Sequence, residues 1–83
     1  MFKQITVILQ HRARKFEMDH VTERFKNVVE KTPMSVFQEG NTINLYLRDD
    51  VEKEKVEAFA RSVGKYRKMK EENCSFSFIV LDK

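Results

Sequence analysis

Residues 34–48 read MSVFQEGNTINLYLR, and this stretch decides the fold. The EGN at 39–41 has the residue types of a tight hairpin turn, because glycine and asparagine accept positive φ angles. The segment after it, TINLYLR, alternates apolar and polar side chains, as a strand with one buried face does. The stretch therefore predicts a hairpin whose two strands cover residues 34–38 and 42–48.

A helical pattern lies on each side of this hairpin. Residues 16–31 carry apolar side chains three or four positions apart, which is typical of an amphipathic helix, and Pro33 should end it. Asp49 is predicted to cap a second helix, since Glu52 follows it at the spacing of a capping box. The apolar stripe of this second helix continues to about residue 70.

Alternating residues predict two more strands, at 3–10 and 75–81. The order of elements is then β-α-β-β-α-β. Two halves of this kind pack most simply as a ferredoxin-like split βαβ fold of the α+β class. Its four-stranded antiparallel sheet has the strand order 4-1-3-2, and both helices lie on one face. At 83 residues the chain is expected to form a single domain over residues 1–83.

Composition narrows the function classes. With 41% hydrophobic and 35% charged residues, the chain has the balance of a globular protein, and its one cysteine, Cys74, cannot form an internal disulfide. No apolar run reaches the length of a secretory signal or a membrane span, so we expect a cytoplasmic protein that does not enter a membrane. No metal-ligand spacing, phosphate loop or nucleophile motif occurs, so the expectation is no enzyme, no metal and no cofactor.

The net charge of +3 understates how basic two segments are, because QHRARK at 10–15 and RSVGKYRKMK at 61–70 contain lysine and arginine but no acidic residue. In the expected topology, the loop after the first strand, the turn at 39–41 and the end of the second helix lie at the same end of the sheet. Two basic clusters far apart in sequence should therefore meet there. We call this predicted surface the basic pole, and its residues are Arg12, Arg14, Lys15, Lys65, Arg67, Lys68 and Lys70.

The basic pole leads to the first functional hypothesis. Clustered lysine and arginine attract phosphates, and the N-terminus of the first helix adds a weak preference for anions. The sequence therefore favours a non-enzymatic binding module whose basic pole contacts nucleic-acid phosphates or an acidic protein surface. The alternative for these charges is a solvated loop, together with cations that offset the dipole at the end of the second helix.

The second functional hypothesis concerns the sheet face opposite the helices, which no predicted element covers. Its alternate positions are more apolar than a solvated surface requires, so the chain could be a protein-interaction or regulatory subunit that forms a homodimer. Stacking of RNA bases on this face is disfavoured, because Tyr46 is its only aromatic residue at a central strand position. The residues expected in the interface are Phe2, Ile8, Tyr46, Ile79 and Leu81.

Overall fold

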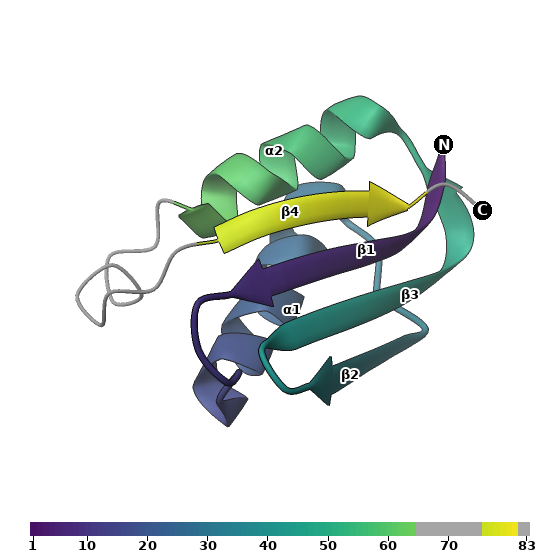
Figure 1. The fold of residues 1–83 in the computed structure, drawn as a ribbon. Coiled ribbons are helices and arrows are strands. Elements are labelled where there is room, and N and C mark those ends of the chain that lie inside the picture. The colour runs from purple at the N-terminus through teal and green to yellow at the C-terminus, as the bar shows by residue number, and fades with distance from the viewer. Residues whose placement is uncertain (65–75, 82–83) are drawn as a thin grey trace.

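The computed structural model describes residues 1–64 and 76–81 (Figure 1). In chain order its elements are β1 (Phe2–Leu9), α1 (Lys15–Val29), β2 (Ser35–Glu39), β3 (Thr42–Val51), α2 (Lys53–Gly64) and β4 (Phe76–Leu81). The four strands form one sheet in the order β2-β3-β1-β4, and every neighbouring pair is antiparallel. Both helices lie on the same side of this sheet. The predicted order of elements and the predicted order of strands are confirmed.

The hydrophobic core lies between the helices and the sheet. Ile5, Val7 and Leu9 of β1 are almost completely buried, as their alternation in the sequence predicts. Across the helix pair, the rings of Phe25 and Phe59 meet edge to face with their centroids 5.5 Å apart. The other buried core residues are Ala13, Val21, Val29, Ile43, Leu45, Leu47, Val51, Val56 and Val63.

Helix α1 begins and ends slightly earlier than its apolar pattern predicts. Arg14 is its N-cap residue, in extended backbone conformation, and Glu17 lies in the first turn. The helix ends at Val29 because Glu30 adopts the left-handed conformation, with φ 62°, and its N–H donates to the carbonyl of Lys26 at 3.0 Å. The chain therefore leaves the helix before it reaches the predicted stop at Pro33.

The capping role predicted for Asp49 is wrong. Asp49 and Asp50 belong to β3, which continues to Val51, and Val51 is buried and pairs with Phe2. Burial of Val51 extends the strand by three residues beyond its predicted end. The carbonyl of Glu52 then accepts the first helical hydrogen bonds, from the N–H groups of Lys55 and Val56, at 3.1 and 3.2 Å. The predicted continuation of this helix to residue 70 and the predicted start of the last strand at Ser75 lie outside the described residues.

The position expected for Phe2 is also wrong. Simple alternation puts this residue on the same face as Gln4, but the β1–β3 register shifts between the two. The shift places Phe2 opposite Val51, and the half-buried ring packs against the hydrophobic core. Phe2 therefore supports the core and does not belong to the face that the helices leave uncovered.

Candidate functional site

The loop after β1 lies against the β2–β3 hairpin. The N–H of Leu9 donates to the carbonyl of Asn41 at 2.8 Å, and the side-chain amide of Asn41 donates back to the carbonyl of Leu9 at 3.0 Å. Further along the loop, the N–H of Ala13 donates to the carbonyl of Gly40 at 2.9 Å. These bonds fix the backbone on both sides of Arg12, and they confirm that the loop and the hairpin share one end of the sheet.

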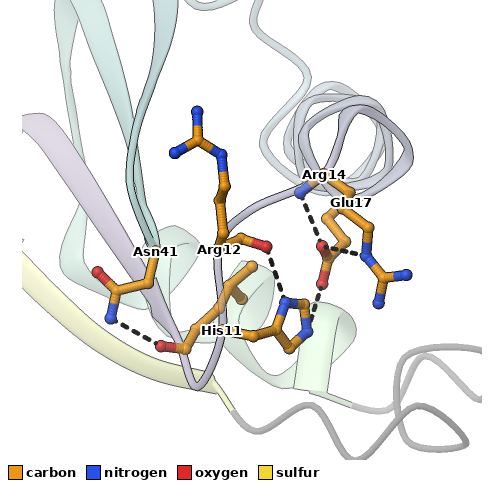
Figure 2. A network of polar contacts seen from close by, with 6 residues as sticks. His11, Arg12, Arg14, Glu17 and Asn41 are labelled. Atoms are coloured by element: carbon orange, nitrogen blue, oxygen red, sulfur yellow. Dashed lines mark hydrogen bonds and ion pairs between the residues drawn. The ribbon is translucent and has the colours of Figure 1, made fainter.

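A buried carboxylate lies at the centre of this end of the molecule. Glu17 is 0% exposed, and its Oε1 accepts the backbone N–H of Arg14 at 2.8 Å (Figure 2). Its Oε2 is 3.3 Å from Nε2 of His11, and its Oε1 is 3.6 Å from Nε of Arg14. The sequence shows that Glu17 is near the helix start but not that it is buried. This carboxylate lies in the first turn of α1, where it offsets part of the positive end of the helix dipole.

His11 connects the loop to this carboxylate. Its Nδ1 is 2.8 Å from the carbonyl oxygen of Arg12, while its Nε2 faces Glu17. Both neighbours are hydrogen-bond acceptors, so a ring nitrogen that carries a proton donates to the neighbour it faces. His11 and Glu17 together therefore hold the conformation of the loop that presents Arg12 (Figure 2).

The described basic residues of the pole have different environments. The Arg14 guanidinium contacts Glu17 and lies over the ring of Phe16, 5.1 Å from its centroid, so part of its charge is offset. Arg12 and Lys15 are exposed and form no ion pair with the part of the chain that the structure describes. In Figure 2 the Arg12 side chain points away from the His11–Glu17 contacts. Arg12 and Lys15 are thus the described cations that are available to an anionic partner.

The second basic cluster lies outside the described residues, and it includes Lys65, Arg67, Lys68 and Lys70. The positions that flank it in the sequence are described. Helix α2 ends at Gly64 close to the end of the sheet where the β1 loop lies (Figure 1), and β4 begins at Phe76, which pairs with Leu9. Both flanking positions are therefore at the same end of the sheet as Arg12.

The sheet face opposite the two helices, which we call the open face, forms a regular grid. Strand pairing aligns its residues in three rows of four across β2, β3, β1 and β4. The rows are Ser35–Tyr46–Gln4–Leu81, Phe37–Asn44–Thr6–Ile79 and Glu39–Thr42–Ile8–Ser77. Four of the residues predicted for the interface lie on this face, namely Ile8, Tyr46, Ile79 and Leu81.

Phe37 is the residue of this face that sequence reasoning missed. It is 58% exposed, and its ring meets that of Tyr46 edge to face with the centroids 5.8 Å apart. Val36 and Phe37 are adjacent apolar residues in a short strand, so alternation does not show which of them faces the core. The register supplies the answer, since Phe37 pairs with Asn44 on the open face while Val36 packs against the core.

The opposite end of the molecule has mixed charges. A groove of about 470 Å³ lies there, and the α1–β2 connection and the end of β3 line it. Its charged lining residues are Lys31, Arg48 and Asp49. The mixed charge predicted for this end is therefore present, whereas the predicted contrast with the basic pole involves residues outside the described ones.

His20 has a different environment from the exposed one that its sequence neighbours suggest. The ring is half-buried on α1, and burial lowers its pKa, as does the nearby charge of Arg24, while Glu23 acts in the opposite direction. Among residues 1–64 and 76–81, no group of three histidine, cysteine or acidic side chains has the arrangement of a metal site. His20 therefore provides no starting point for a metal centre within these residues.

Neither helix in the described part of the chain has the length and apolarity needed to cross a bilayer. Comparison with protein-family models, with curated proteins and with solved structures finds no match for this chain. The functional argument therefore depends on the charges of the basic pole and on the composition of the open face.

Proposed function

We propose that this protein is a small non-enzymatic binding module whose basic pole contacts the phosphates of nucleic acid. The observation that carries the proposal is a pair of exposed cations: Arg12, on a loop that hydrogen bonds hold against the hairpin, and Lys15, the first residue of α1. A fixed loop loses little conformational entropy when it binds a partner, so less of the binding free energy for a polyanion is spent on ordering the loop. The contacts are electrostatic and carry no base specificity.

The fold that we propose for this module is the ferredoxin-like split βαβ arrangement. Its support is the element order β-α-β-β-α-β, the strand order β2-β3-β1-β4 and the position of both helices on one face of the sheet. This arrangement brings the loop after β1, the β2–β3 hairpin and the end of α2 to one end of the molecule. In this proposal, the topology places the described loop cations at the same end of the molecule as the end of α2, from which the second basic cluster follows in the sequence.

Glu17 affects which basic side chains of the pole can contact a partner. It contacts His11 and Arg14, so it offsets part of the positive charge near the loop, and the same contacts fix the loop's conformation. The proposed phosphate contacts are Arg12 and Lys15, together with Lys65, Arg67, Lys68 and Lys70 from the second basic cluster. Arg14 contributes long-range attraction because its guanidinium is about half exposed.

The test is a salt titration of binding to a short labelled DNA duplex, measured by fluorescence polarisation. Wild-type affinity should fall steeply between about 50 and 200 mM salt. The double variant Arg12→Glu/Lys15→Glu should bind about tenfold more weakly or worse at low salt. It should also reduce the slope of log K against log salt by about two, because each phosphate contact contributes about 0.9 to that slope.

The matched control is Lys53→Glu/Lys55→Glu, which changes the net charge equally at the start of α2. Both lysines are exposed and lie at the end of the molecule opposite Arg12. Equal losses in the two double variants would show that only total charge matters and would refute a site at the basic pole. If the protein binds no duplex at low salt but binds an acidic protein, the basic pole is a protein-binding surface. This result would refute the nucleic-acid assignment.

A further inference from the structure

The open face is depleted of charge. Charged residues make up 35% of the chain, yet the twelve positions of the grid hold a single charged side chain, Glu39, at one corner. A surface that binds nucleic acid needs lysine or arginine, and this grid has neither. The centres of protein–protein interfaces, in contrast, are depleted of charge and enriched in aromatic residues. The composition of the face therefore favours a protein partner.

The same face exposes large apolar side chains. Phe37 is 58% exposed, Ile79 is 46% exposed and Leu81 is 39% exposed. Phe37 and Ile79 stand at the two ends of the middle row, so apolar surface extends over both sides of the grid. Water contact with surface of this kind is unfavourable, and a partner that covers it gains the free energy of apolar burial.

The area of the grid fits a weak symmetric dimer. Four strands about 4.8 Å apart and rows that span about six residues along each strand give a flat area of about 400 Å². Two copies together bury about 800 Å² if the surfaces are treated as flat, and protruding side chains add to this area. The value is slightly below the limit of about 1,000 Å² for specific interfaces. An interface of this size belongs to the class of weak, transient associations.

Pairing of two copies through the open face also avoids repulsion between like charges, and the polar side chains at the centre of the grid already have a hydrogen bond. Because Glu39 occupies a corner, a two-fold axis that lies in the interface and runs along the strands or across them places it against the corner at Ser77 or Ser35 of the partner, and not against the partner's own Glu39. At the centre, the Thr6 hydroxyl donates to Oδ1 of Asn44 at 2.8 Å, so these two polar side chains are paired with each other within one copy. We propose that two copies of this chain associate face to face through the open face, with Phe37 and Ile79 as its principal apolar contacts.

The experiment is sedimentation equilibrium of the full chain over a wide range of concentration. Wild type should show a reversible monomer–dimer equilibrium, and Phe37→Asp and Ile79→Asp should each raise the dimer dissociation constant at least tenfold. The control is Asn27→Asp, which adds the same charge at an exposed position on α1, on the side of the helices. It should leave the equilibrium unchanged.

Phe37→Ser covers the case in which an aspartate variant does not fold. Serine adds no charge to the exposed edge strand, and circular dichroism and thermal melting report whether the fold is kept. A wild-type protein that is monomeric at every concentration overturns the proposal, and so does a dimer that all of these folded variants leave intact.

The dimer is independent of the proposed nucleic-acid contact. The double variant Arg12→Glu/Lys15→Glu should therefore dimerise as wild type does, because neither residue belongs to the grid. Loss of the dimer in that variant would show that the association uses the basic pole and would overturn the assignment to the open face.

Discussion

Glu17 connects the fold of the loop to the charge of the basic pole. A buried carboxylate costs free energy unless positive groups and N–H donors surround it, and here the backbone N–H and guanidinium of Arg14, the facing ring nitrogen of His11 and the positive end of the helix dipole do so. Its spacing of three residues from Arg14 is visible in the sequence. Its burial is not, because burial depends on the loop at His11 folding back over the start of the helix.

We predict that Glu17→Ala lowers the free energy of unfolding by about 1–3 kcal/mol, since it leaves the backbone N–H of Arg14 and the facing side chains of Arg14 and His11 without their acceptor. Glu17→Gln keeps a side-chain oxygen for the N–H of Arg14 but loses the ion pair with the Arg14 guanidinium, so its cost should be about half as large. Urea denaturation measures both. The control is Glu23→Ala, an exposed site on the same helix, which should stay within about 0.5 kcal/mol. A Glu17→Ala cost no larger than the control's would contradict this role.

The centres of the elements were predictable and their ends were less so. Alternation assigns Ile5, Val7 and Leu9 correctly because the two-residue period is a local property of the strand. Burial of Val51 is a tertiary contact, and it keeps Asp49 in a strand although the residue is a good helix cap. The face of Phe2 depends on a register shift, which has no signature in the sequence.

Two positions with positive φ, one at the end of α1 and one in the hairpin, test the cost of left-handed backbone conformation. Glu30, after α1, and Gly40, in the hairpin, both have φ 62°, a conformation that costs a residue with a Cβ atom about 1 kcal/mol. Glu30→Gly should therefore raise the free energy of unfolding by about 0.5–1 kcal/mol, and Gly40→Ala should lower it by a similar amount. A Cβ at Gly40 meets no atom within 4 Å, so this comparison isolates the backbone term. Denaturation curves in which both changes have the same sign would contradict it.

At the scale of the whole molecule, the two proposed surfaces adjoin. The corner of the open face at Glu39 leads directly into Gly40, whose carbonyl holds the basic loop at Ala13. A face-to-face dimer therefore carries two basic poles next to one apolar interface. Each copy is 32 Å long, so the two poles lie within about 65 Å of each other, which is the length of about 20 base pairs at 3.4 Å per base pair.

The two proposals together predict that affinity depends on duplex length. A duplex of about 40 base pairs reaches both poles of a dimer, and the second contact becomes intramolecular, whereas about 10 base pairs reach one pole. Relative to the Asn27→Asp control, Ile79→Asp should weaken binding of the long duplex about tenfold or more and leave the short duplex unchanged. Fluorescence polarisation above and below the dimer dissociation constant measures this. Equal weakening on both duplexes would contradict bivalent binding, because Ile79 would then affect the phosphate contact of a single pole.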